Sequence, residues 1–149
     1  MRVREATMRE LILLPALARY SDVAFLLLRL LIGSFLIWGV WDNIASADRM
    51  REFAGFLAKF DFPLPELMAP LSVCVQFMIG VAFIFGVATR WAGLLCAINF
   101  IIAIVMVDRF GGIRGAFPAL CLVSIGWVLA TYGAGRFSID ASLARSRER

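Results

Sequence analysis

Four long apolar runs constrain the fold of this chain more than any other feature of its sequence. They extend over residues 23–41, 67–87, 91–107 and 116–132. A helix needs about 20 apolar residues, with a range of about 17–25, to cross the hydrocarbon core of a bilayer. Hydrophobic residues make up 62% of the 149-residue chain, whereas a soluble domain has about 45–50%. The sequence therefore predicts an all-α integral membrane protein, a four-helix bundle.

The predicted spans form one membrane domain over residues 23–140. An N-terminal segment, residues 1–22, precedes it, and a basic tail, residues 141–149, follows it. The second and third runs are separated only by Ala-Thr-Arg at 88–90, which predicts a tight antiparallel connection. Aromatic residues typical of a membrane interface stand near the predicted span ends: Tyr20, Trp38, Trp41, Trp91 and Tyr132.

The connection after the first span has helical periodicity. Its apolar residues recur at positions 50, 53, 57 and 60, and most of its charged residues lie elsewhere around the helix. This pattern predicts an amphipathic helix lying at the non-cytoplasmic interface, which Pro63 and Pro65 would end before the second span begins. Such a helix is either a static cap over the bundle or a gate for a substrate.

The distribution of basic residues predicts the orientation in the membrane. Arginine accounts for 14 of the 15 basic residues, and Lys59 is the single lysine. Outside the spans, nine basic residues fall on the side of the termini and five on the other side. The positive-inside rule therefore places both termini in the cytoplasm. Because the charges flank the spans, we expect this chain to contact the bilayer and to bind no nucleic acid.

Several classes of site are not supported by the sequence. There is no histidine, which is the usual haem ligand and a common metal ligand. Cys74, Cys96 and Cys121 all lie in apolar runs, where thiols are usually inert. No phosphate-binding loop, catalytic triad or metal-ligand cluster is visible, so we expect no metal, and no catalytic residue can be named. The short apolar patch before Pro15 does not predict a cleaved signal peptide.

Arg29 is the one charged residue inside the first apolar run. A guanidinium at the centre of a lipid-embedded helix costs roughly 3 kcal/mol or more. One interpretation is that Arg29 extends to the cytoplasmic interface and is satisfied by Asp22, carbonyl groups or lipid headgroups. The other is that it faces the bundle and holds an anion or a carbonyl oxygen.

Two amide side chains lie near the middle of other spans. Gln76 follows Ser72 by one helical turn in the second span, and Asn99 lies in the third. Amides beside small residues can simply hold helices together. The sharper hypothesis is that Arg29, Gln76 and Asn99 converge on one polar pocket in an apolar wall, suited to a quinone-like head group or a small oxyanion.

The last span is followed by Gly-Ala-Gly-Arg-Phe-Ser-Ile-Asp, residues 133–140. Gly133 and Gly135 suit a helix end that needs left-handed backbone. Asp140 is positioned to cap a short basic helix in the tail.

Three motifs together resemble the DoxX family of small bacterial four-helix membrane proteins. They are the Arg29 segment of the first span, the segment 86–93 that contains Arg90, and residues 133–140. The resemblance marks as family-motif residues Arg90, Gly133, Gly135, Arg136, Ser138 and Asp140. The sequence departs from the family pattern where Gln76 replaces a common Glu, Asp42 a Lys and Ala134 a Pro. Without that Glu, Asp22 or Asp140 becomes the expected partner of Arg29.

The resemblance implies a membrane subunit that works beside redox proteins. The family is named after a subunit associated with a terminal quinol oxidase, and relatives form the membrane part of thiosulfate:quinone oxidoreductase. Under this hypothesis the chain has no cofactor of its own, and a quinone would occupy the polar pocket. The alternative is a structural or assembly subunit without chemistry. A transporter or channel is a third hypothesis, but four helices are few and no inverted repeat is visible.

Overall fold

The computed structural model describes residues 14–147, so most of the predicted N-terminal segment and the end of the tail lie outside the described residues. The described part of the chain is helical and contains no strand, which confirms the all-α fold class. Its elements are η1 (Pro15–Tyr20), α2 (Ser21–Ala45), α3 (Ala47–Ala58), α4 (Pro65–Phe85), α5 (Thr89–Met106), η2 (Asp108–Gly111), α6 (Gly112–Tyr132) and α7 (Ile139–Arg147).

Four of these helices are long and apolar enough to span a membrane. They are α2 (together with η1), α4, α5 and α6. They coincide with the four predicted runs, although α2 extends four residues beyond Trp41 and α6 begins four residues before Ala116. The chain is therefore a multi-pass membrane protein.

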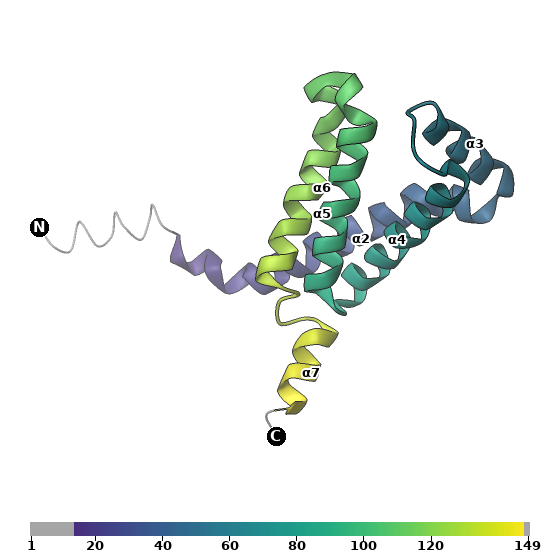
Figure 1. Ribbon diagram of the computed structural model, residues 1–149. Helices are drawn as coiled ribbons and strands as arrows, with labels where there is room; N and C mark the ends of the chain where they lie inside the picture. Colours follow the sequence, from purple (N-terminus) through teal and green to yellow (C-terminus); the bar gives the residue numbers. More distant parts are fainter. Residues whose placement is uncertain (1–13, 148–149) are drawn as a thin grey trace, which may run out of the picture.

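The four spans form two antiparallel pairs, α2 with α4 and α5 with α6 (Figure 1). A Cβ atom built on Gly33 of α2 would lie 2.7 Å from the carbonyl oxygen of Gly80 in α4. One built on Gly93 of α5 would lie 2.5 Å from the carbonyl oxygen of Gly126 in α6. Each pair therefore has its backbones in direct contact, which only glycine permits.

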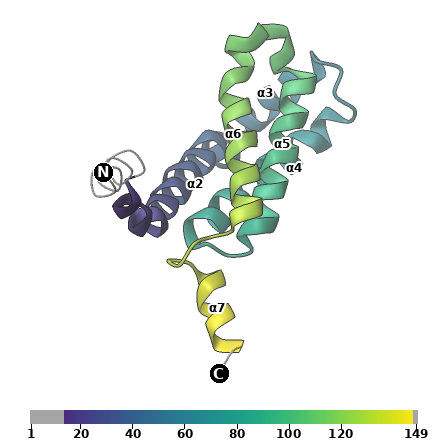
Figure 2. The same ribbon diagram turned by 90° about the vertical axis from the view of Figure 1, so that its left-hand side faces the viewer.

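The two pairs diverge from one end of the molecule to the other (Figure 1). We call the end where residues 86–89 and 133–140 lie the motif end, and the opposite end, which carries α3 and η2, the α3 end. Figure 2 shows α7 leaving the motif end and pointing away from the spans.

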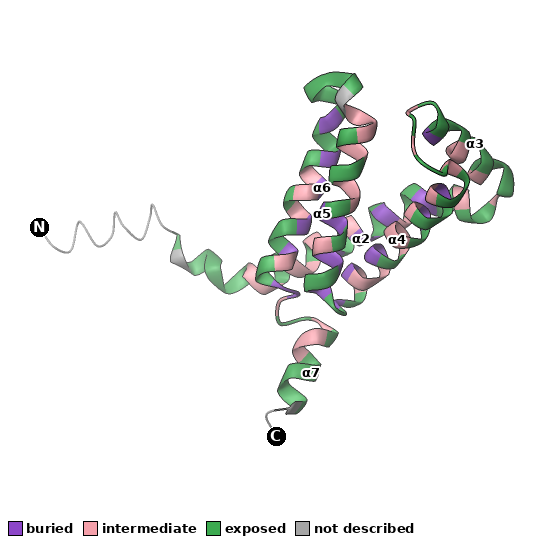
Figure 3. Cartoon of the chain, viewed as in Figure 1, coloured by how far each residue is buried: buried purple, intermediate pink, exposed green. Residues whose placement is uncertain are grey.

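The buried residues lie where the helices face one another, and the outer faces are exposed (Figure 3). The core cluster consists of Leu36, Ile79, Phe83, Ala92, Cys96, Leu122 and Leu129. The exposed faces are themselves apolar, and Trp38, for example, is 80% exposed. An apolar exterior around a small core is what contact with lipid requires.

The predicted amphipathic helix is confirmed as α3. Leu57 on its apolar face is buried, whereas its charged residues are exposed and form the ion pairs Arg49–Glu52 and Arg51–Asp48. Ser46 caps its first turn by accepting a hydrogen bond from the amide of Arg49 at 3.4 Å. As predicted, α4 begins at Pro65, where a missing N–H costs nothing.

Candidate functional site

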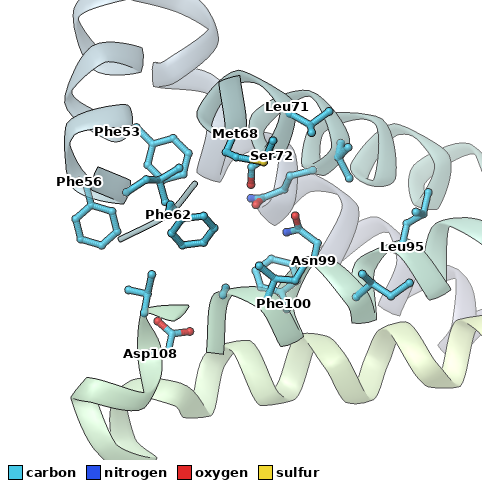
Figure 4. Close-up of a pocket in the computed structure, with 17 residues that line it drawn as sticks. Phe53, Phe56, Phe62, Met68, Leu71, Ser72, Leu95, Asn99, Phe100 and Asp108 are labelled. Atoms are coloured by element: carbon cyan, nitrogen blue, oxygen red, sulfur yellow. The ribbon is translucent and has the colours of Figure 1, made fainter. Parts of the chain in front are cut away.

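A cavity of about 430 Å³ lies between α4 and α5 toward the α3 end (Figure 4). Its lining comes from α3, from Phe62 in the following connection, from the first half of α4, from α5 and from Asp108 in η2. The cavity forms here because the two helix pairs have diverged, and α3 covers the opening that results.

Aromatic rings make up much of the cavity wall. Phe53 and Phe56 contribute from α3, Phe62 from the connection and Phe100 from α5. Figure 4 shows the first three of these rings grouped on one side of the cavity. Such a wall favours a flat apolar ring as ligand.

Four polar side chains also line the cavity: Ser72, Gln76, Asn99 and Asp108. Ser72 and Gln76 are one turn apart on α4, and Asn99 of α5 faces Ser72 across the cavity (Figure 4). Gln76 Nε2 donates a hydrogen bond to the carbonyl oxygen of Leu36 at 3.3 Å. Within the described chain, the side chains of Ser72 and Asn99 make no hydrogen bond. Polar groups without partners in an apolar cavity are available to a ligand.

The cavity opens sideways, toward the region that lipid would occupy. Leu71 of α4 and Leu95, Ile98 and Ile102 of α5 line it and are each about half exposed. At the α3 end, ring contacts link the two helix pairs: Phe56 lies 5.0 Å from Phe60, and Phe60 lies 5.8 Å from Phe110 of η2, measured between ring centroids. A lipid-dissolved ligand therefore has a more direct path than a water-soluble one.

Arg29 does not line this cavity, so the expectation that it meets Gln76 and Asn99 there is wrong. Its side chain is fully buried at the motif end, and its Nη2 donates to the carbonyl oxygen of Phe137. Gln76 instead lies level with Leu36, which is seven residues, or about two turns, further along α2. The sequence placed each of these residues in a span but could not give their relative depths in the bundle.

The expected partners of Arg29 are engaged elsewhere. Asp22 accepts a hydrogen bond from the Arg136 amide at 3.0 Å. Asp140 accepts from the amides of Ala88 and Thr89 at 2.8 and 2.9 Å. Arg29 forms no ion pair among the described residues, and its Nε and Nη1 have no hydrogen-bond partner there.

Asp140 caps α5 and not the tail helix, contrary to the expectation from sequence. Its carboxylate satisfies two amides at the first turn of α5, where the helix dipole favours a negative charge. Ser138 caps α7 instead, because its Oγ accepts from the amide of Ala141 at 3.1 Å.

The other motif residues also hold backbone together. Arg90 Nη1 donates to the carbonyl oxygens of Ala130 and Thr131 at 3.2 and 2.6 Å, and so closes the end of α6. Gly133 and Gly135 have positive φ angles of 93° and 74°, which favour glycine, although the ψ angle of −163° takes Gly133 out of the left-handed helical region that was expected. The motif therefore fastens α2, α5 and α6 at one end of the molecule.

A second cavity, of about 420 Å³, lies at the motif end and is lined by Arg90, Ser138 and Asp140 among others. The hydrogen bonds described above already occupy these three side chains. The cavity beside α3 is the better candidate site, because fewer of its polar side chains already make hydrogen bonds within the protein.

Sequence reasoning selected Gln76 and Asn99 but missed most of the wall. Phe53 of α3 was noticed for its periodicity and Phe56 was not, and only the packing of α3 against α4 brings both to the cavity. Asp108 directly follows the third predicted span, a position that signals an interfacial residue and no particular role. Among the described residues, no three His, Cys, Asp or Glu side chains are grouped so that they could hold a metal ion.

Four spans, an amphipathic cover helix and a laterally open cavity define a small helical membrane protein with one candidate ligand site. The sequence model of the DoxX family matches residues 24–109, more than half of the chain. The chain therefore belongs to the DoxX family. No curated protein and no solved structure matches it. The family match extends from α2 to η2 and includes every residue that lines the cavity.

Proposed function

We propose that this protein is the membrane subunit of a redox system and binds a quinone in the cavity between α4 and α5. The observation that carries the proposal is the pairing of Gln76 and Asn99 in an aromatic-walled cavity that opens toward lipid. Membership of the DoxX family supports the association with redox proteins.

Each part of a quinone, its ring, its oxygen atoms and its tail, has a complementary feature in the cavity. The ring would pack between the phenylalanine side chains, and its oxygen atoms would hydrogen-bond to the amides of Gln76 and Asn99. The isoprenoid tail would leave through the lateral opening past Ile98 and Ile102, which are 46% and 47% exposed. Electrons would pass between the quinone and a redox-active partner protein.

Quinone binding by the purified chain in lipid nanodiscs tests this proposal. We expect Gln76→Leu or Asn99→Leu to weaken the affinity about tenfold each, since a lost hydrogen bond in an apolar site costs about 1–1.5 kcal/mol. Asn43→Leu is the matched control, because Asn43 lies near the end of α2, outside the cavity. Circular dichroism would verify that all variants fold.

Unchanged affinity in both cavity variants, or no binding by the natural sequence, would contradict the proposal. That result would favour the alternative of a structural or assembly subunit. In that case a side chain of a neighbouring protein, or a lipid, would fill the same cavity.

We also propose that the motif end faces the cytoplasm in the bacterial inner membrane. Over the full sequence, nine basic residues outside the spans fall on the side of the motif end and five on the other side, and the positive-inside rule places such an excess in the cytoplasm. In a cysteine-free background, Ser142→Cys should be protected from a membrane-impermeant maleimide added to intact spheroplasts, and Ala47→Cys should be labelled. The reverse pattern would invert the topology.

A further inference from the structure

We infer that the second cavity, at the motif end, binds the headgroup of a phospholipid that carries a primary ammonium group beside its phosphate, as phosphatidylethanolamine does. The inference does not depend on the proposed function, because it concerns the other end of the molecule and a different ligand. Its basis is that one positive and one negative side chain line the same cavity at the membrane interface without pairing with each other.

This cavity, of about 420 Å³, lies at the level where the spans end. Its walls are the first turn of α5, the end of α6, the connection between α6 and α7, and the first turn of α7. Two of the side chains that line it, Trp91 and Tyr132, are 70% and 52% exposed. Exposed Trp and Tyr rings at the ends of spans are typical of the headgroup region of a bilayer. A lipid headgroup can therefore enter this cavity while its acyl chains stay beside α5 and α6.

Arg90 supplies the positive charge, and hydrogen bonds to the end of α6 hold it in place. Its Nη1 donates to the carbonyl oxygens of Ala130 and Thr131, and its Nη2 donates to that of Tyr132 at 3.4 Å. A guanidinium has five N–H groups, and the Nε of this exposed side chain makes no hydrogen bond in the described chain. The neighbouring wall is backbone at Gly133, where a Cβ atom would lie 3.6 Å from Nε. Arg90 therefore presents free N–H groups, at a fixed position, to a phosphate.

Asp140 supplies the negative charge from the first turn of α7. Its Oδ1 accepts from the amide of Ala88 and its Oδ2 from the amide of Thr89, at 2.8 and 2.9 Å. A carboxylate has about four acceptor positions, so about two remain for a ligand. Thr89 directly precedes Arg90 in α5, yet Arg90 and Asp140 form no ion pair with each other within the described chain. The cavity therefore favours a ligand that carries a cation as well as an anion.

The two charges distinguish between common phospholipid headgroups. Phosphatidylethanolamine has a phosphate for Arg90 and an ammonium with three N–H donors for Asp140. Phosphatidylcholine has the same two charges, but its three methyl groups leave the nitrogen without a donor. Phosphatidylglycerol has a phosphate and no cation, so it places a second negative charge near Asp140 without compensating the first. The ethanolamine headgroup alone among the three satisfies both side chains.

The test is native mass spectrometry of the full chain in detergent with an equimolar mixture of these three lipids, all with the same acyl chains. We expect one molecule of phosphatidylethanolamine to be retained about fivefold more than either other lipid, since a partly exposed ion pair changes an affinity by about that factor. Ala141→Leu should remove this preference, because it fills the cavity and leaves both charged side chains in place. Ala144→Leu is the matched control, because Ala144 is exposed on the same helix and does not line the cavity.

Asp140→Asn, which keeps the shape of the side chain and removes its charge, should raise the retention of phosphatidylglycerol relative to phosphatidylethanolamine. Equal retention of the three lipids by the natural sequence, or a preference for either of the other two, would overturn the inference. A preference that is unchanged in Ala141→Leu or in Asp140→Asn would show that the lipid is selected elsewhere, and would equally overturn it. Soluble O-phosphoethanolamine at the same concentration should not displace the lipid. Displacement would identify a soluble zwitterion as the ligand and show that the assignment to a lipid is wrong.

Discussion

Arg29 donates a hydrogen bond to a backbone oxygen inside the protein and forms no ion pair among the described residues. Its guanidinium donates to the carbonyl of Phe137, and the absence of a side chain at Gly86 leaves room for it: a Cβ atom there would lie 1.9 Å from Nη1. A carbonyl in the loop after the last span thus receives its hydrogen bond from a residue 108 positions earlier in the chain. At the scale of the residue, Arg29 is an anchor for residues 133–140.

Replacing Arg29 should therefore loosen that loop more than it disturbs the spans. In Arg29→Met we expect amide hydrogen exchange across residues 133–140 to speed up about ten- to a hundredfold, since the loop loses one charge-assisted hydrogen bond worth about 1.5–3 kcal/mol. Hydrogen exchange with mass spectrometry on the protein in nanodiscs measures this. Arg19→Met, at an exposed arginine, should leave the loop unchanged. Equal rates of hydrogen exchange across residues 133–140 in the two variants would show that Arg29 does not anchor this loop.

The helix pairs depend on close backbone contact, and each contact has glycine on both sides. Gly33 and Gly80 are reciprocal, because a Cβ atom on either would lie within 2.8 Å of the other's carbonyl oxygen. Gly93 and Gly126 repeat this arrangement in the second pair. In a membrane the attraction between helices comes from packing and not from the hydrophobic effect, so such contacts determine which helices pair.

Gly80→Ala should accordingly destabilise the protein by about 1–3 kcal/mol, because the added methyl group separates α2 from α4. Thermal unfolding in detergent would give the change. Gly55→Ala in α3 is the control, since no atom lies within 4 Å of the added methyl group there. That substitution should stabilise the exposed helix by about 0.5–1 kcal/mol. Equal changes in stability at the two sites would show that the close α2–α4 contact does not stabilise the protein.

The elements could be predicted from sequence, because length and apolarity alone specify a membrane span and periodicity alone specifies the face of α3. The contacts between elements could not. Asp140 caps a helix that begins 51 residues earlier, and no local pattern in the tail distinguishes that role from capping its own helix. Likewise, Gln76 and Asn99 were found because amides are rare in apolar runs, but the depth of Arg29 depends on how α2 and α4 slide past each other.

At the scale of the whole molecule, the two helix pairs are joined differently at their two ends. At the motif end, Phe25 of α2 stacks on Tyr132 of α6 with ring centroids 4.0 Å apart, in addition to the hydrogen bonds of residues 133–140. At the α3 end, the ring of Phe60, which follows α3, contacts the ring of Phe110 in η2, with ring centroids 5.8 Å apart. This asymmetry predicts that the two helix pairs pivot about the motif end. The cavity would then widen or narrow at the α3 end.

Phe60→Ala should therefore broaden the separation of the two pairs at the α3 end without separating them at the motif end. Spin labels attached through Glu66→Cys and Ile113→Cys, at exposed positions near the starts of α4 and α6, would report it as a wider distance distribution in a cysteine-free background. Phe117→Ala is the matched control, because Phe117 is 61% exposed and lies outside the cavity. If both variants give the same distance distribution as the spin-labelled protein without either substitution, the ring contact does not hold the pairs together.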